Sequence, residues 1–440
     1  MRAAGLAVIL LANYFFYAKW DLFYLALIPA ASTCDFFLGL GIGRSTSPGR
    51  RKFLVSLSVL LNLGLLAVFK YMPFFLDNWA KLSGGAAHKW AWTFPLGLSF
   101  YVFQSLTYTI DIYRKDAKPS ESMLAHFAAV TFFPTTLAGP ITRVSTIIAQ
   151  LEKTNRILDP ADGGRALFLI GLGMMKKLLI ADYLAENIVN RIFDFPKLYT
   201  SSEVLVGVYA YAVQLYYDFS GYSDVALGSA LLLGIKLPQN FNAPYSAANI
   251  ADFWRRWHIS LSNWLRDYLF FSLPGKRSKV WPYFNLTATM AIGGFWHGAS
   301  WNFLVWGLLH GFALAVVRYL DVRRGKGPKR LNPYFSTFLT VQFVCFAWIF
   351  FRAPTFDAAL AVAGRISAFA FGFDNISASL WIVLSVAIGG HYIKPKWFDW
   401  LRELFVRVPF YAQAAALFLL AIAIQYVGTT GAAPFIYTKF

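Results

Sequence analysis

Long apolar runs separated by short polar stretches cover most of the 440-residue chain. A helix needs about 20 apolar residues to cross a bilayer, so the shorter runs would be re-entrant or half-helices. The pattern predicts an all-α polytopic membrane protein with about ten to twelve helices, re-entrant or interfacial ones included. No hydrophilic run is long enough for a soluble domain, so residues 1–440 are expected to form one membrane-embedded domain. The apolar runs fall at about 3–18, 20–42, 53–76, 93–112, 124–140, 164–193, 203–235, 281–297, 299–320, 334–352, 377–393 and 408–428.

Composition agrees with a lipid environment. The chain is 58% hydrophobic and 14% charged, with a mean hydropathy of +0.50. Soluble domains are about a quarter charged, and a soluble fold could not hide this much apolar surface. The net charge of +18 comes from Lys and Arg spread between the apolar runs. The positive-inside rule explains that spread better than a nucleic-acid surface does, so lipids and not nucleic acids are the expected partners.

Two basic loops predict the orientation of the chain. The loops at 44–52 and 318–330 carry most of their charge as Lys and Arg, and both are expected to face the cytoplasm. If the second apolar run is a full span, residues 19–21 lie outside and Met1 inside. Bulky aromatics at 13–17 stand where a cleavage site would need small residues, which predicts a retained membrane helix.

The first segment with chemical potential is NIADFWRRWHISLSNWLRDYLFF, at 249–271. Asn249 followed by Asp252 resembles a helix start. Aromatic residues recur at helical spacing on one side, while Arg255 and His258 recur on another. The spacing predicts a single amphipathic helix. It could lie in the headgroup region as an anchor, or it could place His258 on the wall of a polar cavity.

The second segment is AIGGFWHGASW, at 291–301. His297 follows a glycine pair, has Trp296 beside it, and lies between apolar stretches. A histidine at membrane depth is costly and suggests function, although it could also be a structural group that bonds a neighbouring helix. His310, on the next apolar run, is better explained as structural.

Two further polar segments interrupt apolar sequence. Asp218 and Asp224 belong to QLYYDFSGYSD, at 214–224, where lipid could not satisfy them. Either aspartate could orient a histidine, pair with an arginine of the amphipathic segment, or form a structural ion pair. Arg143 follows the proline-interrupted FFPTTLAGPITR. Its guanidinium could bind phosphate or carboxylate, or it could be an ordinary boundary charge.

Several enzyme classes lack their motifs. The sequence contains no GxxxxGK[ST], GxSxG or HExxH pattern, and His258 and His297 have no carboxylate or Cys set at metal-ligand spacing, so no metal is expected. Acyl transfer fits what remains. A histidine can take the proton from an acceptor hydroxyl as that hydroxyl attacks a thioester, and a dry pocket limits hydrolysis of the donor.

Four stretches together resemble one known family. The membrane-bound O-acyltransferase (MBOAT) family, and most closely its alginate O-acetyltransferase (AlgI-type) branch, is similar to this chain over nearly its whole length. The stretches are YYDFSGYSDVALGSALLLGIKLPQNFNAPYSAANIADFWRRWHISLSNWLRDYLFF, GGFWHGASWNFLVWGLLHG, LAGPITR and PFIYTKF.

The resemblance implies a bacterial inner-membrane protein with helices around a central tunnel and core motifs at about 130–310. His297 would be the catalytic histidine, His258 the second histidine of the cavity, and Arg143 a functional arginine. The donor would be a cytoplasmic thioester, acetyl-CoA in this branch, with no bound cofactor. The acetyl group would pass to a polysaccharide or to a periplasmic acetyltransferase partner.

Two other functions and several other candidate residues also follow from the sequence. D-alanyl transfer to a cell-wall polymer, or non-enzymatic transport of a lipid or glycan, stay open as other functions. Further candidates for donor binding or cavity lining are Asp218, Trp254, Arg255, Arg256 and Trp296.

Overall fold

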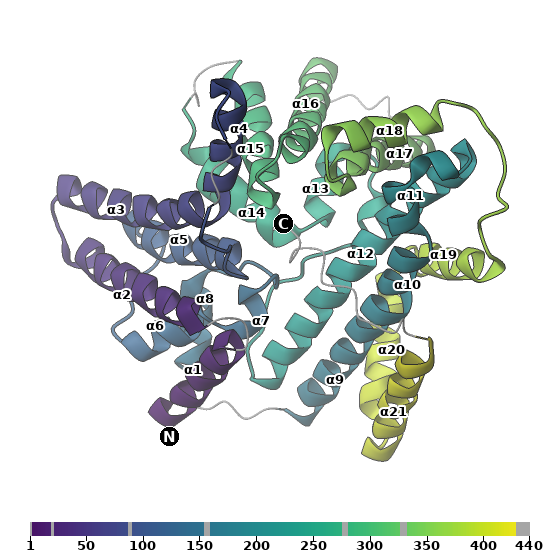
Figure 1. The fold of residues 1–440 in the computed structure, drawn as a ribbon. Helices are drawn as coiled ribbons and strands as arrows, with labels where there is room; N and C mark the ends of the chain where they lie inside the picture. The colour runs from purple at the N-terminus through teal and green to yellow at the C-terminus, as the bar shows by residue number, and fades with distance from the viewer. Residues whose placement is uncertain are drawn as a thin grey trace. The chain divides into compact units, whose positions relative to one another are not determined.

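The chain folds into helices grouped in two compact units. The computed structural model describes residues 2–18, 22–86, 90–153, 159–274, 280–325 and 332–427. One unit comprises Met1–Asp159 with Ser229–Pro238, and the other comprises Pro160–Gly228 with Gln239–Phe440. The described residues contain helices and no strand (Figure 1), so the predicted all-α class is confirmed. Met1, residues 19–21, part of the second basic loop (326–331) and the final motif (434–440) lie outside the described residues.

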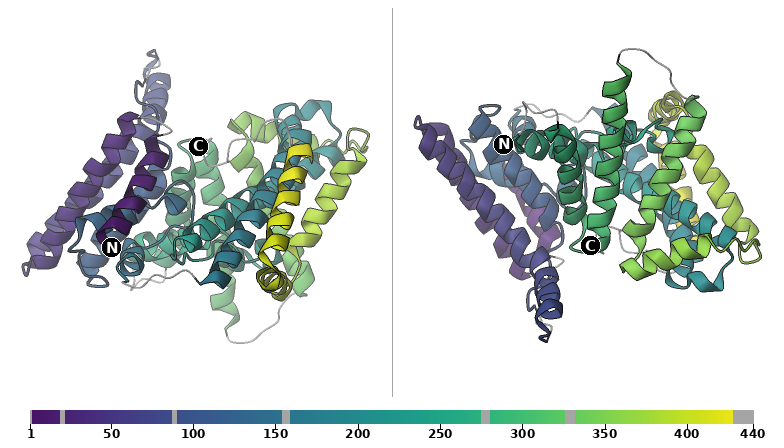
Figure 2. Two further views of the ribbon diagram at one scale, coloured as in Figure 1. Left: turned by 90° about the horizontal axis from the view of Figure 1, so that it is seen from below. Right: turned by 90° about the horizontal axis from the view of Figure 1, so that it is seen from above.

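The first unit contains the N-terminal helices, in which α2 and α3 lie side by side (the purple pair in Figures 1 and 2). Its elements are α1 (Arg2–Ala18), α2 (Leu22–Arg44), α3 (Pro48–Leu66), η1 (Ala67–Tyr71), α4 (Met72–Ser83), α5 (Leu98–Arg114), α6 (Met123–Val130), α7 (Phe133–Thr136) and α8 (Val144–Leu151). The side chain of Ser47 caps α3 by accepting a hydrogen bond from the backbone N–H of Arg50, and Pro48 occupies the first turn. Both residues favour a helix start at this point.

Buried polar contacts hold α2, α3 and α5 together. The carboxylate of Asp35 on α2 accepts hydrogen bonds from Ser58 Oγ at 2.6 Å, Asn62 Nδ2 at 2.8 Å and Ser105 Oγ at 2.6 Å. Arg51, which the sequence placed in the first basic loop, lies in the first turn of α3 and donates to the carbonyls of Ile42, Ile112 and Tyr113, at the ends of α2 and α5. A cation at helix C-termini is favourable because the helix dipole is negative there.

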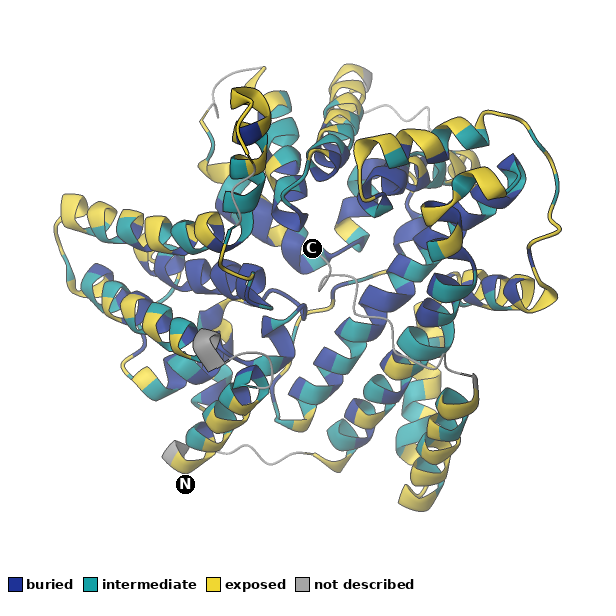
Figure 3. Cartoon of the chain, viewed as in Figure 1, coloured by how far each residue is buried: buried dark blue, intermediate teal, exposed yellow. Residues whose placement is uncertain are grey.

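The second unit carries both motif histidines. Its long helix α12 is buried along most of its length (dark blue in Figure 3), and its last residues fall in the first unit. The elements are α9 (Pro160–Met174), η2 (Met175–Ala181), α10 (Asp182–Leu184), η3 (Ala185–Val189), α11 (Asn190–Asp194), η4 (Pro196–Leu198), α12 (Ser201–Leu232), η5 (Pro244–Ser246), α13 (Ile250–Arg256), α14 (Ile259–Trp264), η6 (Leu265–Leu269), η7 (Phe270–Ser272), α15 (Trp281–His297), α16 (Trp301–Arg324), α17 (Pro333–Arg352), α18 (Phe356–Ile366), α19 (Ala378–His391), α20 (Pro395–Arg407) and α21 (Phe410–Val427).

The predicted apolar runs coincide with helices. By length and composition, four helical stretches in the described part of the chain could cross a membrane: Leu25–Arg44, Pro48–Ser83, Trp301–Arg323 and Pro333–Arg352. Shorter apolar helices of 10–17 residues include Ala4–Ala18, Met123–Thr136, Ala378–His391 and Phe410–Tyr426. The sequence pattern did not predict α8, α18 or α20.

The segment at 249–271 departs from its prediction. It is not one amphipathic helix, because the chain breaks between α13 and α14 at His258, whose φ of 40° and ψ of 56° are left-handed. The predicted start at Asn249 is confirmed, since its side chain accepts a hydrogen bond from Asp252 N at 2.8 Å. Beyond the break, residues that would share one face of a continuous helix no longer do so. The Arg255 side chain is 68% exposed, whereas His258 is fully buried.

Helices α15 and α16 form a tight hairpin that fixes the end of α15. A Cβ added at Gly294 would collide with the backbone carbonyl of Phe303 and would lie 3.0 Å from Gly307 Cα. A Cβ at Gly307 would in turn collide with the carbonyl of Met290. Backbones can approach this closely only where both helices carry glycine. His297 therefore lies at the end of a helix whose position is set by backbone contact.

We expect Gly294→Ala to lower the free energy of unfolding by about 1–3 kcal/mol, because the added methyl group has no space. Gly389→Ala on α19 is the matched control, since no atom lies within 4 Å of its added Cβ. It should be neutral or stabilising by about 0.5–1 kcal/mol. Thermal melting of the purified, detergent-solubilised chain measures both. Equal effects of the two substitutions would contradict the close-packed hairpin.

Candidate active site

His297 is the last residue of α15 and lies among aromatic rings. Gly298 follows it and ends the helix by donating its N–H to the Gly294 carbonyl at 3.4 Å. The imidazole of His297 is 4% exposed. Its centroid lies 5.1 Å from the Trp296 ring, 5.3 Å from Trp306 and 5.4 Å from Phe351. Its surroundings are therefore largely apolar, which limits access of water.

His258 lies beside His297, although 38 residues separate them in the sequence. The two ring centroids are 6.4 Å apart, with an angle of 54° between the planes. On another side the His258 ring meets Phe219 of α12 edge-to-face, at 4.6 Å. The fold thus brings together the two histidines that the sequence singled out.

A cluster of tryptophans packs behind this pair. Trp306 on α16 stacks on Trp348 of α17, with centroids 5.6 Å apart and an angle of 15°. Trp254 of α13 donates its Nε1–H to Nδ1 of His310 at 3.3 Å. His310 thus bonds a neighbouring helix, as the structural interpretation of this residue expects. Such broad rings hold the histidines in place and exclude water from them.

The aspartates of α12 form ion pairs with lysines. Lys177 Nζ lies 2.6 Å from Asp218 Oδ1 and 2.7 Å from Asp182 Oδ1, and Lys176 Nζ lies 2.6 Å from Asp224 Oδ2. Of the alternatives left open by the sequence, these contacts agree with the structural ion pair. The arginines of the 249–271 segment contact other carboxylates, since Arg255 and Arg256 lie against Asp252 and Arg266 lies against Asp267.

The candidate arginines have other surroundings. Arg255 and Arg256 lie 3.5 Å and 3.0 Å from the Asp252 carboxylate, within one turn of α13. Arg143 belongs to the first unit, where it directly precedes α8. Its guanidinium lies 3.6 Å from Asp111, and its side chain is 44% exposed. The Arg143 side chain is therefore partly accessible to solvent or to a ligand.

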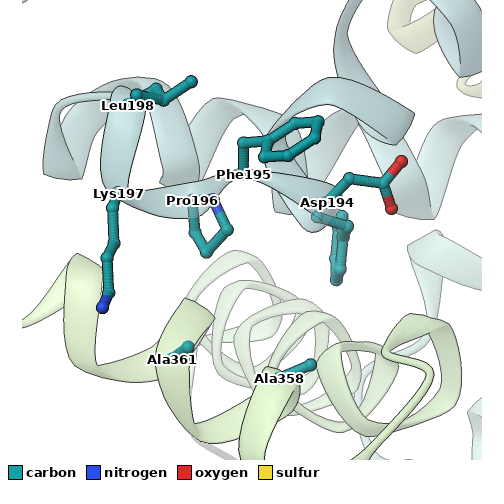
Figure 4. Close-up of a pocket in the computed structure, with 8 residues that line it drawn as sticks. Asp194, Phe195, Pro196, Lys197, Leu198, Ala358 and Ala361 are labelled. Carbon is teal, nitrogen blue, oxygen red and sulfur yellow. The ribbon is translucent and has the colours of Figure 1, made fainter.

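Two open pockets lie elsewhere in the second unit. One, of about 360 Å³, lies between the α11–η4 turn and α18 (Figure 4), where Asp194 and Lys197 are its charged residues. The other, of about 380 Å³, lies along α16 and α17. Neither lining includes a histidine. Among the described residues, no group of three or more His, Cys, Asp or Glu could hold a metal ion.

Sequence reasoning missed two features of this unit. The lysine pair at 176–177 lies inside an apolar run, just as Asp218 does. A charged residue in such a run is the signal that singled out Asp218, and it could have singled out the lysines as well. The loop at 240–242, in PQNFNAPY, contacts both sides of the break at His258. It could not have been found from spacing, because the break itself was not predicted.

Comparison with known proteins identifies relatives across most of the chain. The model of the membrane-bound O-acyltransferase family matches residues 113–354, more than half of the chain. The probable alginate O-acetylase AlgI of Azotobacter vinelandii is 39% identical over 380 residues, covering 84% of this chain and 74% of the relative. The peptidoglycan O-acetyltransferase of Helicobacter pylori is 36% identical (80% and 72%). The teichoic acid D-alanyltransferase of Bacillus subtilis is 28% identical (59% and 69%).

The ion pairs of Lys177 give a prediction. Lys177→Met removes the cation that Asp182 and Asp218 share, and loss of one partner of a buried pair costs about 3–5 kcal/mol. Asp218→Asn leaves Lys177 with Asp182 and should cost less. The yield of folded protein in membranes and its melting temperature compare the two variants. A Lys177→Met chain as stable as Asp218→Asn would contradict this assignment.

Proposed function

The chain belongs to the membrane-bound O-acyltransferase family and is an O-acyltransferase; from this premise we propose that it transfers acetyl from cytoplasmic acetyl-CoA toward a polysaccharide outside the cytoplasm. Relatives named for alginate and peptidoglycan O-acetylation support the acetyl group and the glycan acceptor. The apolar helices support a multi-pass location, which for this proposal is the bacterial inner membrane.

The observation that carries the proposal is the buried pair of His258 and His297. In the proposed step, a ring nitrogen of His297 takes the proton from an acceptor hydroxyl. The hydroxyl oxygen forms a bond to the carbonyl carbon of the thioester, the carbon–sulfur bond breaks, and the sulfur leaves with the proton that His297 returns. The products are the acetyl ester and the free thiol. No covalent enzyme intermediate is needed.

The other residues take supporting roles in this proposal. His258 helps to place or polarise the reacting groups, while the rings of Trp254 and Trp296 keep water from the thioester. Arg143 and the exposed Arg255 would bind anionic groups of the donor, because a guanidinium matches phosphate oxygens in a bidentate manner. Helices around a central tunnel would let the donor and the acceptor arrive from opposite sides. The acceptor is either the polysaccharide itself or a periplasmic acetyltransferase partner.

We expect His297→Ala to abolish acetyl transfer while the chain still inserts and accumulates, because the variant lacks the group that accepts the proton. The measurement follows labelled acetyl from acetyl-CoA in membranes, with and without the periplasmic fraction. His391→Gln is the matched control. His391 is a buried histidine whose Nε2 accepts a hydrogen bond from Tyr245 N, and a glutamine oxygen can accept the same bond. Full activity of His297→Ala would remove the proposed mechanism.

The likeness to a teichoic acid D-alanyltransferase favours one alternative donor, an aminoacyl thioester on a carrier protein. Supplying membranes separately with acetyl-CoA and with a D-alanyl carrier-protein thioester decides between them. Transfer from acetyl-CoA alone is the expected result. Transfer from the carrier thioester alone would mean that the transferred group is D-alanyl and not acetyl. Membership in an acyltransferase family favours an enzyme over the non-enzymatic transporter considered from the sequence.

A further inference from the structure

The backbone at His258 has a conformation that needs external support. With φ of 40° and ψ of 56°, this residue lies in the left-handed region. For a residue other than glycine this costs about 1–2 kcal/mol. Such a conformation persists only where the surroundings determine it, and it is often found at functional sites. The contacts on both sides of His258 therefore decide where its imidazole points.

Asn240 accepts three hydrogen bonds from the two residues that follow His258. Its backbone carbonyl accepts a hydrogen bond from Ile259 N at 2.9 Å. Its side-chain Oδ1 accepts two more, from Ser260 Oγ at 2.7 Å and from Ser260 N at 3.3 Å. On the preceding side, Asn242 N donates to the Arg256 carbonyl at 2.9 Å. The loop at 240–242 thus bridges the break between α13 and α14.

The same side chain also ties this bridge to α12. Asn240 Nδ2 donates to Ser223 Oγ at 3.3 Å, and Ser223 lies one helical turn beyond Phe219, whose ring contacts His258. Asn240 is 2% exposed, so its bonds do not compete with water. An amide fits this position because it accepts at Oδ1 and donates at Nδ2. An alanine at position 240 could neither accept nor donate these side-chain hydrogen bonds.

We propose that Asn240 is a positioning residue for acyl transfer: it holds His258 in its left-handed conformation and thereby sets the spacing between the imidazoles of His258 and His297. The role rests on the proposed function of that histidine pair. Asn240 does not touch the reacting groups in this proposal and acts only through His258.

The test compares the kcat and KM for acetyl-CoA of full-length wild-type and variant chains. The acceptor is whichever of alginate or peptidoglycan the wild type acetylates. We expect Asn240→Ala to lower kcat by about ten- to a hundredfold, because small misplacements of a catalytic group have effects of this size. KM should change little, since donor binding is assigned to other residues. Asn285→Ala is the matched control, because Asn285 is also buried, at 6% exposed, and its Nδ2 donates to the Pro274 carbonyl at 3.1 Å. It should keep the wild-type kcat per folded molecule.

A double-mutant cycle separates positioning from general destabilisation. If Asn240 acts only through His258, Asn240→Ala should cause no further loss of activity in a His258→Ala background. Full additivity of the two losses, or a wild-type kcat for Asn240→Ala, would overturn the proposal. Wild-type membranes that transfer no acetyl from acetyl-CoA would instead overturn the proposed function.

Two milder variants cover the case in which Asn240→Ala does not accumulate. Ser223→Ala and Ser260→Ala each remove one hydroxyl partner of Asn240 and leave the loop itself intact. Each should lower kcat by a smaller factor than Asn240→Ala is expected to. An unchanged kcat in both serine variants would count against the proposal.

Discussion

Direct backbone contact between α15 and α16 is the constraint on which the geometry of the candidate active site depends. Gly294 and Gly307 let the two helices approach until main-chain atoms meet, so the end of α15, and His297 with it, has little freedom to shift. In an apolar environment such packing is a main source of helix association, because lipid gives no hydrophobic advantage to contact between helices. Rings from α16 and α17 then surround the imidazole and complete its apolar setting.

The second histidine is held by a different means. His258 lies at a break between two short helices, and the preceding loop at 240–242 supports that break through hydrogen bonds. One histidine is thus positioned by close packing and the other by a polar network. Together they place the rings of His258 and His297 with their centroids 6.4 Å apart. Acyl transfer needs such pre-organisation, because the donor is reactive toward water and the reacting groups must be placed before it arrives.

Much of this could be predicted from the sequence, and the failures have physical causes. Apolar runs predicted most helices, since their length and hydropathy reflect a property of each segment alone. His297 and Asp218 were singled out from the sequence because a polar group in an apolar run has few explanations. The break at His258 was missed because helical periodicity continues through 249–271, and only tertiary bonds from Asn240 and Asn242 overrule it. Helix α20 was missed because its mixed polar and apolar sequence resembles a loop when hydropathy is averaged.

The hydrogen bond between Trp254 and His310 has a consequence for proton transfer. An indole nitrogen can only donate, so Nδ1 of His310 must be the accepting atom and the ring's own proton must lie on Nε2. This contact therefore selects one tautomer of His310. Of the two imidazoles that contact Trp306, those of His297 and His310, the second is thus held in one tautomer by its neighbour. In the proposed mechanism, the exchange of protons with substrates then falls to His258 and His297.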